Sequence, residues 1–237
     1  MKSREKAVVL LSGGLDSSTL FYQLAATGFE VRGISVDYGQ RHRKEMDYAR
    51  RTANRLGARH DVVDLTAVTR FLTTSALTST AVTVPEGHYE EESMKLTVVP
   101  NRNALMLSVA YAVAASEGAS LVATAVHAGD HAIYPDCRRE FIEAFQSMED
   151  ASLGEHIELH TPFLHVDKVA IAREAGRLGV PLDETWSCYQ GGERHCGRCG
   201  TCVERAWAIA EAGLYDPTLY ADEAFWRQVM LERVSVG

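Results

Sequence analysis

The chain has 237 residues, of which 46% are hydrophobic, so it can bury a substantial core without help from a partner. Its 24 Lys and Arg stand against 32 Asp and Glu, and the formal net charge of −8 argues against a nucleic-acid partner, because such binding normally requires a basic face. No stretch approaches the roughly 20 apolar residues of a membrane span, and the first apolar segment is too short for a signal peptide, so we expect a soluble, cytoplasmic protein that binds no membrane.

The chain opens with a predicted strand that runs into a glycine turn. Residues 7–11 are apolar and predict a buried strand, and residues 17–24 predict the start of a helix. Between them, Gly13 and Gly14 can adopt positive φ and bring backbone N–H groups close to a ligand. The neighbouring serine hydroxyls add donors beside the positive end of the helix dipole. This arrangement predicts a cradle for phosphate oxygens.

Strands and helices alternate through the next part of the chain. We predict strands at 30–36, 59–65, 120–126 and 156–160, and helices ending near residue 56 and covering 103–116, 138–146 and 168–178. Such alternation predicts an α/β protein of the Rossmann type, with a twisted parallel sheet and helices on both faces. Its ligand would bind beyond the carboxyl ends of the strands.

The segment 66–100 interrupts this alternation. It lacks clear periodicity and is rich in Thr and Ser, and structureless connections of this length are usually lids or disordered. We therefore expect a lid insert here.

Four of the five cysteines gather near the carboxyl end. Cys196, Cys199 and Cys202 are each separated by two residues, a spacing that aims thiolates at one metal, and Cys188 can complete a tetrahedron. A disulfide is disfavoured in a cytoplasmic chain. Four thiolates leave no open position, so we predict one structural Zn²⁺, with iron–sulfur or redox chemistry and free thiols as alternatives. The distant Cys137 is expected to be a buried apolar residue.

The residues around the glycine turn indicate which phosphate chemistry to expect. A Walker loop has four residues between its glycines and ends in Lys-Ser/Thr, and neither feature is present. The pattern Ser-Gly-Gly-x-Asp-Ser instead resembles the PP-loop of ATP pyrophosphatases, which holds the departing pyrophosphate while a substrate oxygen attacks the α-phosphorus. The resemblance implies that ATP contacts Leu11, Ser12, Gly13, Gly14, Leu15, Asp16, Ser17, Ser18 and Thr19.

Further segments narrow this resemblance to one family. They are Asp-Tyr-Gly-Gln-Arg-His at 37–42, Val-Pro-Asn-Arg-Asn at 99–103, Tyr-Pro-Asp-Cys-Arg at 134–138 and Thr-Trp-Ser-Cys-Tyr at 185–189. With the zinc cysteines, they resemble the 7-cyano-7-deazaguanine synthase family of the queuosine pathway, from about residue 8 to residue 213. The resemblance implies that 7-carboxy-7-deazaguanine, ammonia and ATP form the nitrile through two adenylations, first of the acid and then of the amide.

The same resemblance suggests roles for individual residues. Ser12, Asp16 and Arg102 are the predicted catalytic residues. Asp16 would hold Mg²⁺ or fix the loop, with helix capping as the alternative, and Arg102 would clamp a carboxylate or the α-phosphate, with a surface salt bridge as the alternative. His42 is either a proton acceptor or a solvated histidine on a polar helix. The predicted substrate contacts are Tyr38, Gln40, Arg41, Asn101, Arg102, Asp130, Tyr134, Asp136 and Arg138. Helix capping is the alternative for Asn101, and ordinary loop hydrogen bonding is the alternative for the four residues between 130 and 138.

The family resemblance also implies a domain organisation and an assembly. Residues 1–182 would form the PP-loop ATP-binding synthase domain, and residues 183–237 a zinc-binding and helical segment. A homodimer is implied, and the apolar residues Leu219, Phe225, Trp226 and Met230 could form its interface or cap the core. Two other functions stay open: a PP-loop enzyme that adenylates a tRNA base, and a zinc-stabilised nucleotide-binding module without catalysis.

Overall fold

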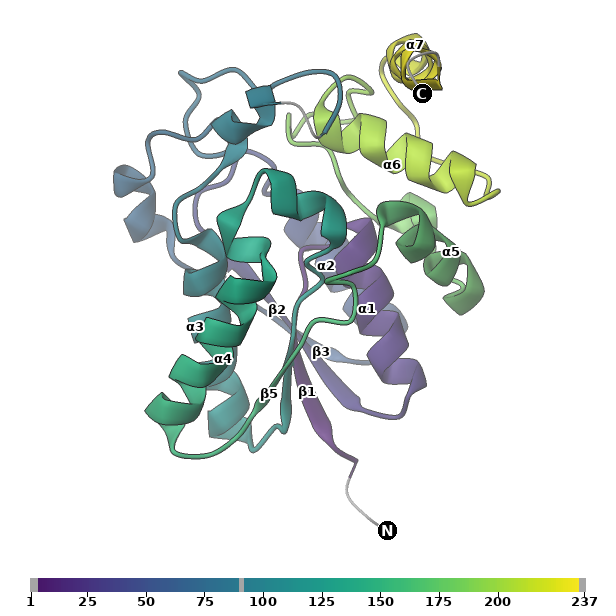
Figure 1. Cartoon of the computed structure of the whole chain (residues 1–237). Coiled ribbons are helices and arrows are strands. Elements are labelled where there is room, and N and C mark those ends of the chain that lie inside the picture. The colour runs from purple at the N-terminus through teal and green to yellow at the C-terminus, as the bar shows by residue number, and fades with distance from the viewer. Residues whose placement is uncertain (1–3, 90–91, 235–237) are drawn as a thin grey trace.

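A computed structural model describes residues 4–89 and 92–234, and a five-stranded parallel sheet lies at its centre (Figure 1). The strands, in the order β3-β2-β1-β4-β5, are β1 (Lys6–Leu10), β2 (Glu30–Asp37), β3 (Arg59–Asp64), β4 (Leu121–Ala123) and β5 (Glu158–His160). The α-helices are α1 (Leu15–Ala26), α2 (Glu45–Arg55), α3 (Arg102–Glu117), α4 (Arg139–Leu153), α5 (Lys168–Leu178), α6 (Gly200–Glu211) and α7 (Glu223–Val234). The predicted parallel α/β fold is confirmed.

Successive residues of β1 point to opposite faces of the sheet and feed two separate cores. Val8 and Leu10 belong to a cluster shared with α3 and α4. Ala7 and Val9 belong to a cluster shared with α1, α2 and α5. Figure 1 shows these two groups of helices on opposite sides of the sheet. With both faces covered, the sheet has room for a ligand at the carboxyl ends of its strands, where the order reverses between β1 and β4.

The C-terminal segment packs on the sheet domain through α5 and α6. Val169 and Ala172 of α5 share a buried cluster with Ala208 and Ile209 of α6. Further along, the Trp226 side chain packs against the cysteine-rich cluster, whereas 67% of Leu219 is exposed. The division at residue 182 and the homodimer stay predictions.

The segment 66–100 differs from the expectation of a structureless connection. It contains two 3-10 helices, η1 (Thr66–Phe71) and η2 (Glu92–Thr97), and its residues Leu72, Leu77 and Met94 are buried in the main core. Its apolar residues follow no helical or strand period, so periodicity missed their burial. Its role as a lid stays a prediction.

Several predicted boundaries were wrong by a few residues. The fourth strand ends at Ala123 instead of residue 126, and α4 continues to Leu153 instead of residue 146. Gly154 ends this helix with φ of 70°. A left-handed glycine after the last helical residue is a common helix end, and it marked this boundary better than hydrophobic periodicity did.

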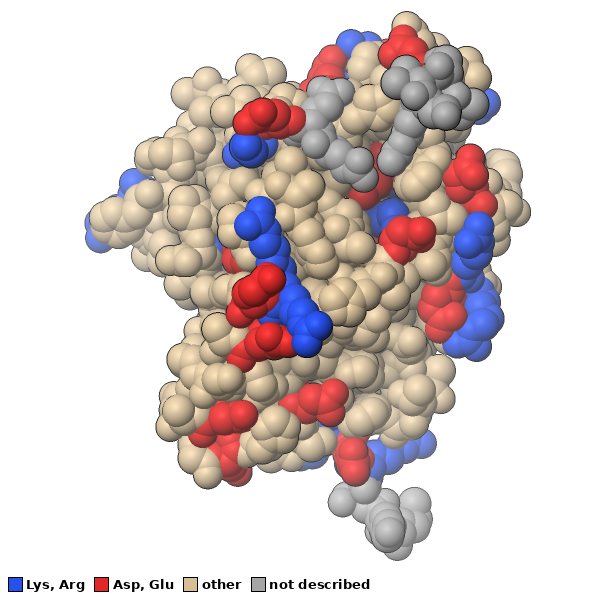
Figure 2. Space-filling model, viewed as in Figure 1, with Lys and Arg blue, Asp and Glu red and all other residues tan. Residues whose placement is uncertain are grey.

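Acidic and basic side chains lie side by side on the face shown in Figure 2, where no continuous basic surface is visible. Ion pairs account for several of the surface arginines, including Arg139 with Glu143 at 2.6 Å and Arg177 with Glu174 at 2.7 Å. Within the described ranges, no helix combines the length and apolar character needed to cross a bilayer.

Candidate active site

The phosphate loop is a tight turn that only glycine can make at residue 13. Gly13 has φ of +77°, and a Cβ there would lie 2.4 Å from the Glu45 carbonyl oxygen and 2.5 Å from the Ala49 nitrogen. The serines close the turn, because Ser12 Oγ lies 3.0 Å from Ser17 Oγ. The loop is therefore held against the start of α2.

The first turn of α1 is free to receive an anion. Gly14 occupies the N-cap position, and in the described chain no side chain caps this helix. The first N–H groups of a helix have no partner within it, and the helix dipole adds partial positive charge. Asp16 is not the cap, so the helix-capping alternative for this residue is wrong. The N–H groups and serine hydroxyls have the chemistry of a phosphate site.

A cavity of about 220 Å³ opens beyond the ends of β1, β2 and β4. It brings together predicted residues from distant parts of the sequence: Leu11, Ser12, Gly14, Leu15, Asp16, Ser17, Tyr38, Arg102 and Asp130. It is also lined by polar residues that the sequence analysis did not select: Glu45, Tyr89, His127, Lys168, Ser187, Tyr189 and Glu204.

Lys168 places a positive charge beside the phosphate loop. Asp167 caps α5 by accepting a hydrogen bond from the Ala170 N–H, which fixes Lys168 as the first residue of the helix. Its Nζ lies 2.5 Å from Asp16 Oδ2 and 3.4 Å from Glu204 Oε2. Burial alone would lower the pKa of Lys168, but the two carboxylates raise it above its ordinary value. The side chain is a cation next to the open end of α1.

Asp130 is held in the cavity by hydrogen bonds from two directions. Its carboxylate accepts hydrogen bonds from the Tyr89 hydroxyl at 3.0 Å and from the backbone N–H of His127 at 3.1 Å. The His127 ring lies 3.5 Å from the same carboxylate. These contacts fix the loop after β4, and they supply a preoriented acceptor at the cavity wall.

Arg102 begins α3 and lies over the ring of Tyr134, with 5.6 Å from the guanidinium carbon to the ring centre. Its Nε is buried and has no hydrogen-bond partner among the described residues. The Tyr134 hydroxyl is 2.6 Å from Thr97 Oγ1, which fixes the ring beneath the guanidinium. This environment excludes the surface salt bridge weighed for Arg102. A donor left unpaired in a cavity wall suits an anionic ligand.

Glu45 and His42 lie together at the cavity wall, where the His42 side chain is buried and the Glu45 side chain is 16% exposed. Glu45 Oε1 accepts a hydrogen bond from Gln40 at 3.0 Å, and Glu45 Oε2 lies 3.4 Å from His42 Nε2. Burial raises the pKa of Glu45 to about 7 and lowers that of His42 to about 3. His42 is 4% exposed, so the alternative of a solvated histidine is wrong. The ring is neutral at physiological pH.

Two residues of the predicted ATP loop turn their side chains away from the cavity. Ser18 Oγ lies 3.3 Å from Thr52 Oγ1, and Thr19 Oγ1 donates to the Leu15 carbonyl at 2.7 Å. Both side chains are buried on the helix face that packs against the protein. Because α1 turns these hydroxyls toward the protein interior, they form hydrogen bonds there and do not face the cavity.

Most predicted substrate contacts outside the loop shape the surrounding turns instead of lining the cavity. Gln40 accepts from the Tyr38 N–H at 2.9 Å, Arg41 donates to the Val82 carbonyl at 3.2 Å, and Arg138 donates to the His131 carbonyl at 2.9 Å. The others that lie outside the cavity lining are Asn101, which precedes α3 with φ of 56°, Tyr134, and Asp136, which accepts from the Asn103 N–H at 3.0 Å.

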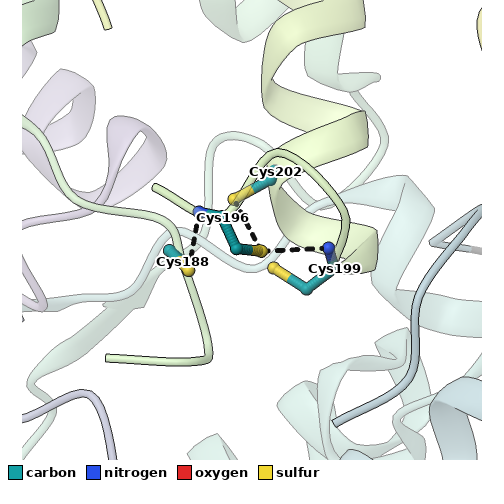
Figure 3. Close-up of side chains that lie close together, drawn as sticks. All are labelled: Cys188, Cys196, Cys199 and Cys202. Atoms are coloured by element: carbon teal, nitrogen blue, oxygen red, sulfur yellow. Dashed lines mark hydrogen bonds between the residues drawn. The ribbon is translucent and has the colours of Figure 1, made fainter. Parts of the chain in front are cut away.

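The last predicted site, the cysteine cluster, forms as expected. The Sγ atoms of Cys188, Cys196, Cys199 and Cys202 lie within 4.8 Å of one another, and none of the five cysteines forms a disulfide (Figure 3). Backbone N–H groups point at Cys196 Sγ from Arg198 at 3.3 Å and from Cys199 at 3.2 Å. Such bonds stabilise a thiolate, so this donor set could hold one metal ion.

The cysteine cluster is connected to the phosphate loop. The backbone N–H of Trp186 donates a hydrogen bond to the Gly13 carbonyl at 2.8 Å. The Trp186 ring packs in the buried cluster that contains three of the cysteines. The remaining Cys137 lies apart, buried as expected, and accepts a hydrogen bond from Asn103 Nδ2 at 3.1 Å.

Comparison with known proteins gives one consistent family. The family model described as Queuosine biosynthesis protein QueC matches residues 6–213. The 7-cyano-7-deazaguanine synthase of Paracoccus denitrificans is 57% identical over 230 residues, covering 96% of this chain and 98% of the relative. That of Ruegeria pomeroyi is 54% identical over 224 residues, covering 94% and 97%. A solved NH3-dependent NAD synthetase from Campylobacter jejuni is 14% identical with a TM-score of 0.48, covering 98% of this chain and 85% of that chain, and so distant a likeness carries no argument.

Proposed function

The chain belongs to the 7-cyano-7-deazaguanine synthase (QueC) family of queuosine biosynthesis, and we propose that its cavity is where 7-carboxy-7-deazaguanine, ammonia and ATP react. The protein is an enzyme of the C–N ligase class. One observation supports the proposed site above all others. The uncapped end of α1, the Lys168 ammonium and the incompletely paired Arg102 guanidinium all face one cavity.

The chemistry requires that oxygen be made a leaving group twice. Neither a carboxylate oxygen nor an amide oxygen departs readily in neutral water, and attachment of AMP changes this. The residues of the loop, from Ser12 to Ser17, would hold the two outer phosphates, which leave as pyrophosphate. Arg102 and Lys168 would stabilise negative charge on the substrate carboxylate and the α-phosphate, so catalysis is mainly positioning and electrostatic stabilisation.

Two metal ions fit residues that the structure describes. Asp16 Oδ1 is buried without a hydrogen-bond partner in the described chain, which suits a Mg²⁺ ion or one of its water ligands. When bound, Mg²⁺ would screen the phosphate charges. The four thiolates suit Zn²⁺ in a closed structural site, because no coordination position is left for substrate. The zinc segment would then support the phosphate loop through Trp186.

The remaining proposals concern the base, the assembly and the location. Asp130 would accept an N–H of the guanine-like edge, and Tyr38 would border the same pocket. The family resemblance supports a cytoplasmic homodimer, for which sedimentation equilibrium should give about twice the 26.1 kDa chain mass. A monomeric mass across micromolar concentrations would contradict the dimer.

The proposed activity is tested by incubating the purified protein with ATP, Mg²⁺, ammonium and candidate substrates. AMP and pyrophosphate should form with 7-carboxy-7-deazaguanine and not with guanine, which lacks the carboxylate. AMP formation that requires tRNA would favour a tRNA-adenylating enzyme instead. No AMP with any substrate would favour a binding module. The interspersed charges of Figure 2 give no support to a tRNA surface on that face.

A further inference from the structure

Conversion of an amide to a nitrile requires a proton acceptor as well as ATP. Once the amide oxygen carries AMP, the neutral imidate still has one N–H bond, and this proton must leave before the carbon–nitrogen triple bond can form. This requirement rests on the function proposed above. The acceptor must lie in the same cavity as the phosphate loop, because the adenylated carbon is attached through oxygen to the α-phosphorus.

Four carboxylates line that cavity, and three of them are already engaged. Asp16 and Glu204 face the Lys168 ammonium, and Asp130 accepts hydrogen bonds from a tyrosine hydroxyl and a backbone N–H. Each of these three carboxylates is therefore already the partner of a charged group or of two hydrogen-bond donors, a role that suits it to holding the site together.

Glu45 has the surroundings that a general base needs. Its polar partners are neutral: the Gln40 amide at 3.0 Å and the His42 ring at 3.4 Å. Its backbone carbonyl lies against Gly13 of the phosphate loop, and its side chain lines the cavity together with Ser12 and Arg102. The carboxylate is therefore largely shielded from solvent, with 16% of its side chain exposed, and it lies next to the place where the phosphate-bound substrate would lie.

We propose that Glu45 is the general base that takes the N–H proton when AMP is expelled from the adenylated amide. The N–H bond breaks and its proton passes to a Glu45 carboxylate oxygen. The electron pair of that bond forms the third carbon–nitrogen bond. The bond between carbon and the AMP oxygen breaks, and AMP leaves with its electron pair. No other reactant is required.

The groups around Glu45 set the direction of the pH dependence. The pKa of Glu45 is raised to about 7: burial is the main cause and nearby Asp37 adds to the rise, whereas the Gln40 hydrogen bond and Arg102 oppose it. Among the described residues, Tyr38 and the neutral His42 ring also lie close to Glu45. A base must be ionised, so the rate of nitrile formation should rise with pH through about 7.

The test starts from the amide with ATP and Mg²⁺, which removes ammonia and its own titration from the experiment. Glu45→Gln should lower the rate of nitrile formation by about 10²- to 10⁴-fold, the usual contribution of a general base. The same variant should still exchange labelled pyrophosphate into ATP in the presence of the amide, because adenylation does not use Glu45. Its remaining rate should lose the pH dependence near 7 seen in the wild type.

Two further variants serve as controls. Glu45→Asp keeps a carboxylate and should recover part of the lost rate. Asp47 lies on the same helix, and its exposed carboxylate pairs with Arg50. Asp47→Asn should leave pyrophosphate exchange and nitrile formation unchanged.

Each outcome separates the inference from the proposed function. Nitrile formation by Glu45→Gln within a few fold of wild type would overturn the role of Glu45 and leave the function standing. Loss of exchange and nitrile together would also overturn it, by placing Glu45 in adenylation. Absence of exchange in the wild type would instead refute the proposed function.

Discussion

Asp16 uses its two carboxylate oxygens in different ways. Oδ2 pairs with Lys168, and Oδ1 is buried without a partner in the part of the chain described. The sequence left open whether this residue fixes the loop or holds Mg²⁺. The two environments support both roles at once, one for each oxygen.

Replacing Asp16 by Asn, a side chain of nearly the same size, tests whether the two oxygens have these two roles. Asp16→Asn should lower kcat/KM by roughly 100-fold or more, the scale of one lost electrostatic contact in an active site, because the neutral amide is a poor Mg²⁺ ligand. Metal bound by the cysteines should be unchanged. Near-normal turnover at limiting Mg²⁺ would show that Asp16 has neither role.

Glu45 also predicts how stability changes with pH. A carboxyl group whose pKa rises on folding stabilises the folded state at low pH, and this stability is lost as pH rises through the folded pKa. With the pKa of Glu45 raised from 4.5 to about 7, wild type should lose this contribution between pH 5 and 8, and Glu45→Gln should not. The free energy of unfolding of Glu45→Gln, relative to that of wild type, should therefore rise by on the order of 2 kcal/mol from pH 5 to pH 8.

Urea unfolding at pH 5 and pH 8 measures this difference without substrate. Asp47→Asn, whose carboxylate is exposed, is the control and should show no comparable growth. An equal difference between Glu45→Gln and wild type at both pH values would contradict the raised pKa.

Among the elements, the turn between β1 and α1 carries a tight steric requirement at Gly13. Gly13→Ala would force a Cβ to 2.4 Å from the Glu45 carbonyl oxygen, whereas Gly28, with φ of +99°, has nothing within 4 Å. Gly28→Ala should cost only the backbone strain of about 1–2 kcal/mol. Gly13→Ala should cost more than this and weaken ATP binding. Urea unfolding and equilibrium dialysis with ATP check both effects, and equal costs would contradict the packing described for the loop.

The cysteine segment is predicted to act through stability. Cys199→Ala should remove most of the bound metal and lower the thermal midpoint by roughly 10 °C, given several kcal/mol from a structural metal and about 2–4 °C per kcal/mol at this size. Weaker ATP binding should follow, because Trp186 connects the segment to Gly13. Cys137→Ala is the control for metal content, since Cys137 lines the cavity but lies outside the cysteine cluster. Elemental analysis measures the bound metal, and melting curves measure the thermal midpoint. A metal-free variant as stable as wild type would contradict a structural role for the metal.

Over the whole molecule, local sequence patterns predicted the parallel α/β fold, the phosphate loop and the cysteine cluster, but not all the residues that line the cavity. The apolar run of β1, the glycine turn and the cysteine spacing are local signals, and each marks its element correctly. In the sequence, Glu45, Lys168 and Glu204 look like the charged residues of solvated helix faces, and only the tertiary fold brings them together at one cavity. Lys168 had one usable signal, since it follows the last strand at the sheet end where ligands bind.

If the enzyme works as proposed, the loop holds the two outer phosphates of ATP and exposes the α-phosphorus to a substrate oxygen. The most direct test uses 7-carboxy-7-deazaguanine labelled with ¹⁸O in its carboxylate and mass analysis of the nucleotide products. We expect AMP that carries ¹⁸O from the carboxylate, together with unlabelled pyrophosphate. ADP with labelled orthophosphate would contradict it.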